Sequence, residues 1–251
     1  TMSAISGFDG LDPTLKIIPH TKTIAIANKE SLICAWNLIK EKIDKHKTNF
    51  VPVDSEHFSI WSLLKGVNAK IEKVYITASG GPFLNISKNR LKNIKPEQAV
   101  KHPRWSMGKK ISIDSATLIN KVFELIEAKK IFDLDYNKIE ILLHPDSYVH
   151  GIVKFSNGIT KLLLHDTDMR IPIFNSLYLS GNKILRSKSL NLHKLNTLNF
   201  RIADDKRFQS IRILNLFKKI KDSLYETVLV SANDELVDLF LKKKITFLDI
   251  T

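Results

Sequence analysis

Short apolar runs that each end in a group of polar residues recur along the first two-thirds of the chain. The first run, residues 22–27, is β-branched and nearly continuous, which is typical of a strand buried in a parallel sheet. Polar residues follow it, and apolar positions then recur at helical spacing as far as Ile43. A strand, a polar tip and a helix form the basic unit of an open α/β sheet, which binds ligands at the carboxyl ends of its strands.

The same pattern predicts further elements downstream. Strands are expected at 49–53, 73–77, 109–113 and 139–143. The run 109–113 leads into Asp114-Ser115, which predicts the start of a helix that continues from about Ala116 to Phe132. Apolar segments on either side of the Asn157-Gly158 turn predict a hairpin of residues 151–155 with 159–164.

Beyond about Ser180 the apolar pattern changes. Residues 181–200 have no clear period, which indicates a connector that crosses the molecule. Helical patterns at 205–221 and 232–243 close the chain. The predicted fold is therefore α/β, with an open, mostly parallel sheet and a hairpin, followed by a connector and a small C-terminal helical domain.

Composition narrows the class of protein. The 251 residues are 43% hydrophobic, which is enough for one large domain or two ordinary ones and excludes intrinsic disorder. With 9 Gly, 8 Pro and 1 Cys, the chain is neither a fibrous repeat nor a disulfide scaffold. Cys34 is interpreted as a small buried residue rather than a nucleophile. No apolar run approaches the roughly 18 residues of a membrane span, so we expect a protein with no membrane partner in a reducing compartment.

The net charge of +13 raises the possibility of a nucleic-acid partner. Of the 39 basic residues, however, only 7 are Arg, whose guanidinium fork is preferred for base and phosphate recognition. Acidic residues are interleaved throughout, and no basic tail is present. We therefore expect a Lys-rich solvated surface and no nucleic-acid partner.

Three groups of residues carry candidate chemistry, and the first follows the strand at 49–53. Asp54 and Glu56 are two positions apart, and in extended chain that spacing points both carboxylates to one side. Hard oxygen ligands of this kind suit Mg²⁺ or Mn²⁺. Taken alone, two acids in a turn are more often simply solvated.

The second group lies on the helix predicted after Ser115. Asn120, Lys121 and Glu124 share one helical face, opposite the apolar face of Leu118 and Val122. A surface Lys–Glu pair is the simpler interpretation. Beside Asp54 and Glu56, however, Glu124 would be a third oxygen ligand, with Lys121 and Asn120 as phosphate or hydroxyl donors.

The third group combines the Ser79-Gly80-Gly81 strand tip with residues 102–108. Glycines at a strand tip let backbone N–H groups approach an anion, and the Ser79 hydroxyl adds a donor. The segment 102–108 contains His102, Trp105 and a terminal Gly108 without helical period, as expected of a lid over a substrate. An ordinary turn and a Trp105 packed in the core are the alternatives.

Several rare blocks stand in a fixed order and spacing along the chain. They are Asn28-Lys29-Glu30-Ser31, Pro52-Val53-Asp54-Ser55-Glu56-His57, Ser79-Gly80-Gly81-Pro82-Phe83, His102-Pro103 with Trp105 to Gly108, Asp114-Ser115-Ala116-Thr117, Asn120-Lys121 with Glu124, His144-Pro145 with Ser147 and His150, and Asp168-Met169-Arg170 with Pro172-Ile173. In this arrangement the chain resembles the 1-deoxy-D-xylulose-5-phosphate reductoisomerase family, densely from Lys22 to Ile173 and more thinly afterwards.

The resemblance implies an enzyme that uses NADPH and one Mg²⁺ or Mn²⁺ ion to rearrange and then reduce a phosphorylated sugar, an early step toward isoprenoid precursors. The implied catalytic and metal-binding residues are Lys29 with the three ligands Asp54, Glu56 and Glu124, and Ser55 contacts the same end of the substrate. The implied contacts of the phosphate end are Ser79, His102, Ser115, Asn120 and Lys121. The implied NADPH contacts are Asn28, Glu30 and Gly108, and the implied flap residues are Trp105 and Met107.

The resemblance also sets expectations for organisation. No Gly-rich dinucleotide turn precedes Asn28, so residues 1–48 would be the end of a nucleotide-binding domain. Residues 49–180 would form the catalytic domain, 181–200 the connector and 201–251 an incomplete helical domain. A homodimer is implied, located in the cytoplasm, or in a plastid if the source is eukaryotic. The alternative is a non-catalytic fragment that binds only metal and phosphosugar.

Overall fold

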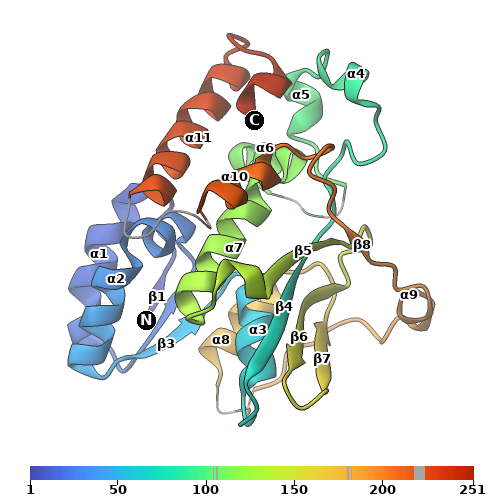
Figure 1. The fold of residues 1–251 in the computed structure, drawn as a ribbon. Helices are drawn as coiled ribbons and strands as arrows, with labels where there is room; N and C mark the ends of the chain where they lie inside the picture. The colour runs from blue at the N-terminus through green and yellow to red at the C-terminus, as the bar shows by residue number, and fades with distance from the viewer. Residues whose placement is uncertain (104, 106, 180, 182, 218–223) are drawn as a thin grey trace.

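The computed structural model describes residues 1–103, 105, 107–179, 181, 183–217 and 224–251 (Figure 1). Its first unit is a three-stranded sheet in the order β1 (Met2–Ser3), β2 (Thr23–Ile26) and β3 (Asn49–Pro52), and both pairings are parallel. Helices α1 (Leu11–Ile17) and α2 (Lys29–His46) lie in the crossovers, with 3₁₀ turns at Phe8–Gly10 and Ile18–His20. The apolar face of α2 packs against Ile24 and Ile26 of β2, which buries the run predicted as a strand.

The second sheet has five strands in the order β7-β6-β4-β5-β8. Their bounds are β4 Ile71–Ala78, β5 Ile139–Leu143, β6 Val149–Phe155, β7 Thr160–Leu164 and β8 Arg201–Ile202. Strands β4 and β5 are parallel, whereas the β6–β7 hairpin and β8 add antiparallel pairings. The α/β class is confirmed, and within it this sheet is mixed.

Helices α3 (Ser55–Leu64) and α7 (Ile119–Ile131) connect the two sheets. Both contact the five-stranded sheet, and α7 also packs along α2. The largest apolar cluster joins α7 residues such as Val122 and Ile126 to Val74 and Ile76 of β4. The predicted packing face of α7 is therefore confirmed. This arrangement brings the carboxyl end of β3, the start of α3 and one face of α7 together.

The remaining helices surround this centre. They are α4 (Lys88–Leu91), α5 (Pro96–Ala99), α6 (Lys109–Thr117), the 3₁₀ turn Tyr136–Lys138, α8 (Arg170–Leu177), α9 (Leu192–Asn196), α10 (Ser210–Phe217), α11 (Tyr225–Leu241) and the 3₁₀ turn Phe247–Ile250. In Figure 1 the red C-terminal helix α11 runs along the top of the molecule between α2 and α5. No helix in the described part of the chain is long and apolar enough to cross a bilayer.

The prediction of a strand at 109–113 is wrong. Those residues form the first turns of α6, whose inner side carries Ile113 and Ala116 into a cluster with Phe240 of α11. Five residues of mixed polarity do not distinguish a strand from a helix, and packing against α11 selects the helix. The predicted helix 116–132 is in fact two helices, because Leu118 adopts the left-handed conformation with φ 66° and separates α6 from α7.

Smaller differences concern element boundaries. The expected helix 205–221 is described as α10 only over Ser210–Phe217, and its residues 218–221 lie outside the described residues. Helix α11 begins seven positions before the predicted 232, and the expected connector contains α9. The predicted lid at 102–108 also includes two residues, 104 and 106, that lie outside the described part of the chain.

Candidate active site

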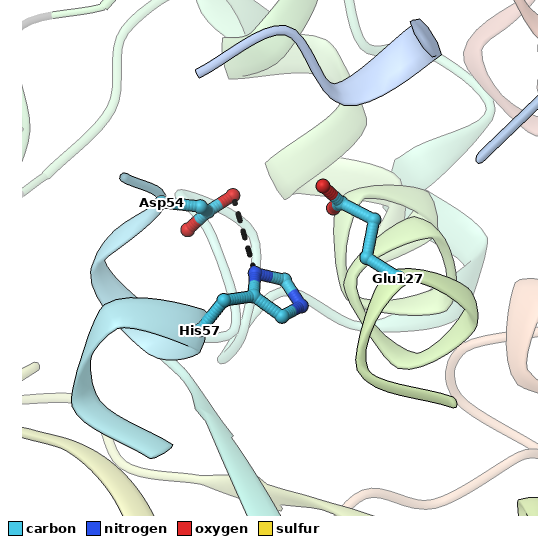
Figure 2. A group of neighbouring side chains, drawn as sticks. All are labelled: Asp54, His57 and Glu127. Atoms are coloured by element: carbon cyan, nitrogen blue, oxygen red, sulfur yellow. Dashed lines mark ion pairs between the residues drawn. The ribbon is translucent and has the colours of Figure 1, made fainter. Parts of the chain in front are cut away.

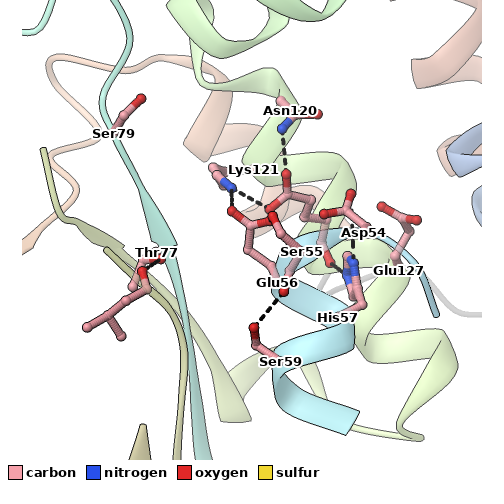
Figure 3. Close-up of polar contacts among 12 residues, drawn as sticks. Asp54, Ser55, Glu56, His57, Ser59, Thr77, Ser79, Asn120, Lys121 and Glu127 are labelled. Atoms are coloured by element: carbon pink, nitrogen blue, oxygen red, sulfur yellow. Dashed lines mark hydrogen bonds and ion pairs between the residues drawn. The ribbon is translucent and has the colours of Figure 1, made fainter. Parts of the chain in front are cut away.

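Three carboxylates converge at the centre of the molecule, two of them neighbours in the sequence and the third on a later helix. Asp54 stands at the end of β3, Glu56 in the first turn of α3 and Glu124 on α7. One oxygen atom from each lies within 4.8 Å of those from the other two. Glu56 and Glu124 are buried, and Asp54 is partly exposed. Figure 3 shows the cluster between α3 and α7, with Ser79 on the far side of Lys121.

The reason given for the convergence of Asp54 and Glu56 is wrong, although the convergence itself is observed. The chain is not extended through both residues, because α3 begins at Ser55 and Glu56 belongs to its first turn. Asp54 is the residue directly before α3, with φ −53° and ψ 134°, so the change from strand to helix, rather than strand alternation, orients the two carboxylates. Acidic residues are also favoured at this end of a helix by its dipole.

Two lysines neutralise much of the cluster. The Lys121 Nζ donates to Glu56 Oε1 at 2.5 Å and to Glu124 Oε2 at 2.6 Å. The Lys29 Nζ lies 2.6 Å from Asp54 Oδ2, 2.9 Å from Glu127 Oε2 and 3.8 Å from Glu124 Oε1. The predicted surface Lys–Glu pair on α7 is therefore a buried ion pair in which Lys121 bridges two carboxylates.

Burial and charge move the pKa values of these groups in opposite directions. Burial, together with the nearby charge of Glu56, holds the pKa of Glu124 well above its usual range despite Lys121. Burial would also raise the pKa of Asp54, but the Lys29 ammonium outweighs it and keeps that pKa well below its usual range. Asn120 donates to Glu124 Oε1 at 2.5 Å, and the Ser55 hydroxyl donates to Glu56 Oε2 at 2.5 Å. Of these carboxylates, Glu124 is thus the one whose negative charge is least favourable without a further cation.

Hydroxyl and imidazole groups form the second part of the site. The His102 Nδ1 accepts from the Trp105 backbone N–H at 2.9 Å, so the hydrogen of the neutral ring is on Nε2, which lies 3.1 Å from Ser79 Oγ. Ser79 Oγ also accepts from the Gly81 backbone N–H at 3.2 Å. Ser79 can therefore still donate its own hydroxyl hydrogen to a ligand. Burial and then Lys121 lower the pKa of His102 to about 4.

Helix α6 lies directly against this strand tip. A Cβ on Gly81 would come within 2.8 Å of both Ala116 Cα and Ser115 O, so the glycine permits the contact. Gly81 also has φ 69°, a left-handed conformation that side chains disfavour. Ser115 is therefore held beside the Ser79 tip, and the start of α7 presents Asn120 and Lys121 to the same region.

The three residues predicted to contact NADPH lie at the starts of two different helices, α2 and α6. The Asn28 Oδ1 accepts from the Ser31 N–H at 2.6 Å and caps α2, while its Nδ2 donates to the carbonyls of Ile5 and Gly7. Glu30 lies in the first turn of α2 and Gly108 at the start of α6, and no hydrogen bond among the described residues joins them to Asn28. Asn28 thus organises the loop that follows β1.

The flap residue Trp105 contacts a pair of histidines. Its ring packs edge-on against His150 at 6.0 Å between centroids, and His150 stacks on His165 at 3.7 Å. Burial lowers the pKa of both imidazoles, which favours their neutral forms. Met107 is partly buried.

Glu127 and His57 adjoin the candidate site although the sequence did not single them out. Glu127 is 1% exposed and pairs with Lys29, and the His57 Nε2 donates to the Glu124 carbonyl at 2.8 Å. The spacing of Glu127 three positions after Glu124, on the same helical face, is the signal that could have revealed it. His57 had a weaker signal, because it only ends the Asp54-to-His57 block.

The chain matches known sequences throughout. Three family profiles match it: "1-deoxy-D-xylulose 5-phosphate reductoisomerase" over residues 1–36, the C-terminal domain of that enzyme over 50–132, and a second C-terminal domain of DXP reductoisomerase over 164–251. The 1-deoxy-D-xylulose 5-phosphate reductoisomerases of Pelagibacter ubique and Clostridium tetani are 63% and 44% identical to it, over 100% and 99% of this chain. The chain spans 65% of the length of each of these relatives.

Solved structures agree with the sequence matches. The reductoisomerase of Zymomonas mobilis in complex with NADPH superposes with a TM-score of 0.90 at 40% identity, over 100% of this chain and 65% of that protein. A DOX-P reductoisomerase in complex with NADPH, fosmidomycin and magnesium has a TM-score of 0.88 at 36% identity, over 99% of this chain and 64% of that protein. Sequence, fold and the converging carboxylates lead to one conclusion: this chain belongs to the 1-deoxy-D-xylulose 5-phosphate reductoisomerase family.

Proposed function

We propose that the protein containing this chain converts 1-deoxy-D-xylulose 5-phosphate to 2-C-methyl-D-erythritol 4-phosphate with NADPH and a divalent cation. The observation that carries the proposal is the buried convergence of Asp54, Glu56 and Glu124 beside Lys29 and Lys121. The relatives' names and the NADPH and magnesium complexes of solved relatives support it.

The residues present fit a Mg²⁺ or Mn²⁺ ion. All three proposed ligands offer carboxylate oxygen atoms, which hard divalent cations prefer. Burial and the neighbouring Glu56 charge raise the pKa of Glu124, and a cation among these oxygens would favour its ionised form.

The proposed site holds the substrate at both ends. Ser79, His102, Ser115, Asn120 and Lys121 would bind the phosphate, because they offer hydroxyl, imidazole, amide and ammonium donors. Ser55 and Lys29 would hold the opposite end next to the carboxylates. When bound, the cation would polarise the substrate's carbonyl and hydroxyl oxygens, and NADPH would supply hydride from the side of Asn28, Glu30 and Gly108.

The chain's own residues would then position and protect the reacting fragment. The Lys29 and Lys121 ammonium groups would hold negative charge that develops on substrate oxygen atoms. Trp105 and Met107 would cover the substrate and exclude water while reactive carbonyl species exist. We extend the proposal to residues 49–180 as the catalytic domain, to a homodimer and to a cytoplasmic location, or a plastid in a eukaryote.

The Glu124→Gln variant tests the function in the intact protein. We expect turnover, followed as consumption of NADPH with the deoxyxylulose phosphate and Mg²⁺, to fall at least about 100-fold, because even outer partners of metal ligands are worth about 10–100-fold. The control is Glu226→Gln. Glu226 lies on α11, outside the site, and its carboxylate pairs with Lys130 of α7, the helix that also carries Glu124.

Two outcomes would contradict the proposal. Retained turnover in Glu124→Gln would remove Glu124 from the set of ligands. An intact protein that binds Mn²⁺ and phosphosugar but consumes no NADPH would favour the alternative of a binding protein without catalysis.

A further inference from the structure

A second group of ligand-type side chains adjoins the three-carboxylate cluster. The second group is Asp54, His57 and Glu127. Each offers one atom that could bind a metal ion, these atoms lie within 4.8 Å of one another, and Asp54 belongs to both groups. Figure 2 shows the Asp54 and His57 side chains on one side and Glu127 of α7 facing them. We refer to Asp54, His57 and Glu127 as the second trio.

The cation that the structure places in the second trio is an ammonium. The Lys29 Nζ lies 2.6 Å from Asp54 Oδ2 and 2.9 Å from Glu127 Oε2, which are distances of direct charge-assisted hydrogen bonds. His57 contributes little to this contact, because its Nδ1 stands 3.9 Å from Asp54 Oδ2. Lys29 is thus the bridge between the two groups.

Glu127 has no other partner of this strength in the described part of the chain. It is 1% exposed, and the hydrogen bond it accepts comes from Lys29, 98 positions earlier in the sequence. A buried carboxylate without a partner is strongly unfavourable, so the pair has to form together. Asp54, in contrast, is shared between Lys29 and the proposed cation site.

The charges of the two groups balance only when Glu127 is included. The carboxylates are Asp54, Glu56, Glu124 and Glu127, and the ammonium groups are Lys29 and Lys121. With all four carboxylates ionised, four negative and two positive charges leave two negative charges, which one divalent cation neutralises. Without Glu127 only one negative charge would remain, and the Lys29 ammonium would depend on Asp54.

We propose that Glu127 is a positioning residue: it is the counter-ion that holds the Lys29 ammonium beside Asp54, so that the ammonium and a divalent cation share Asp54 rather than compete for it. The inference rests on the cation site of the proposed function. Glu127 itself is not among the proposed ligands, and it would remain paired with Lys29 while Asp54 binds the cation.

The test is Mn²⁺ binding to the intact protein without substrate, measured by titration calorimetry. Glu127→Gln should bind Mn²⁺ about tenfold more weakly than the wild type, at the lower end of the effects of outer partners of a metal site. The double variant Lys29→Gln/Glu127→Gln removes both charges and should return to within about threefold of wild type, because the two effects compensate. Glu226→Gln, another partly buried carboxylate that pairs with a lysine of α7, should bind as the wild type does.

Each other outcome has a defined meaning. Unchanged affinity in Glu127→Gln overturns the inference, and so does a double variant as weak as the single one, since that result indicates a packing role. If circular dichroism shows that Glu127→Gln is unfolded, Lys29→Gln alone decides, with tighter Mn²⁺ binding expected and unchanged binding overturning the inference. A wild-type protein that binds no Mn²⁺ overturns the cation site, and this inference with it.

Discussion

At the scale of single residues, the candidate site is distinguished by burial of charge. Glu124 is 1% exposed, and Lys121 is also buried, whereas ionisable side chains usually remain in water unless they are paired. Taken one at a time in the sequence, these residues favoured a solvated turn or a surface ion pair over a site. Their burial in one place, with alternating charge, is what favours a site.

His102 gives a prediction for the dependence of stability on pH. Its pKa is lowered to about 4 by burial and by Lys121, whereas an unfolded histidine titrates near about 6.5. The unfolded state therefore binds more protons between those values, so this contribution to stability is complete above about pH 6.5 and is lost as the pH falls toward about 4. His102→Gln should lose less stability over this range than the wild type.

Urea unfolding of the two proteins at pH values across this window measures the difference. The His193→Gln variant of an exposed histidine on α9 serves as the control and should follow the wild type. Parallel stability curves for His102→Gln and the wild type would show that His102 is not held neutral by the fold.

At the scale of elements, close contacts between one strand tip and one helix shape the phosphate side of the site. The Ser79-to-Gly81 tip after β4 lies against α6, and the left-handed Leu118 then redirects the chain into α7. Because of this break, Ser115 of α6 and Lys121 of α7 belong to two helices with different directions, which one straight helix would not allow. The break therefore matters as much as the helices.

Gly81→Ala tests this contact. Its added Cβ would meet the α6 backbone at 2.8 Å in a left-handed conformation, so we expect a loss of about 2–4 kcal/mol in the free energy of unfolding. Gly158→Ala is the matched control, because Gly158 has φ 84° but no atom within 4 Å of its added Cβ. That control should cost only about 1–2 kcal/mol. Equal losses in chemical denaturation would show that the α6 contact is not tight.

At the scale of the whole molecule, the C-terminal helices hold the phosphate side in place. The Asn233 Nδ2 of α11 donates to Asp114 Oδ1 of α6 at 2.8 Å, and the Ser210 hydroxyl donates to the Thr117 carbonyl at 2.7 Å. Arg207 also donates to the Phe83 carbonyl at the strand tip. Residues more than 90 positions apart thus fix the helix that carries Ser115.

Asn233→Ala should therefore destabilise the protein although it lies outside the proposed site. The change removes a buried hydrogen bond to a carboxylate, so a loss of about 2 kcal/mol is expected in thermal or urea unfolding. Asn175→Ala removes a hydrogen bond of an exposed amide to the Ile171 carbonyl and should cost less than about 0.5 kcal/mol. A loss in Asn233→Ala no greater than that of the control would show that α11 does not hold α6.

The net charge has a different meaning at this scale. Most of the excess of lysine is consistent with a solvated surface, with exposed pairs such as Lys16–Asp12 and Lys40–Asp44 on helices. Lys29 and Lys121, in contrast, point inward and are bound by carboxylates. The charge therefore gives no support for a nucleic-acid partner.

The sequence by itself determined the elements with strong local signals. Strand β5 has the predicted bounds, the Asn157-Gly158 turn joins β6 and β7, and the polar tips after β3 and β4 carry Asp54, Glu56 and Ser79. Hydrophobic period and turn chemistry act over a few residues, so a single sequence records them directly. The motif blocks also contained Lys29, Asn120 and Lys121, which contact the three carboxylates in the structure.

Only the tertiary structure decided what depends on contacts between distant segments. Helix α6 replaced the predicted strand at 109–113 because α11 packs on it, and Leu118 divided the predicted helix 116–132. Glu127 became a candidate site residue only through Lys29, 98 positions away. The local pattern of residues does not predict which buried charges pair with each other. The pairing depends on which opposite charge lies nearby once folding has removed water from both groups.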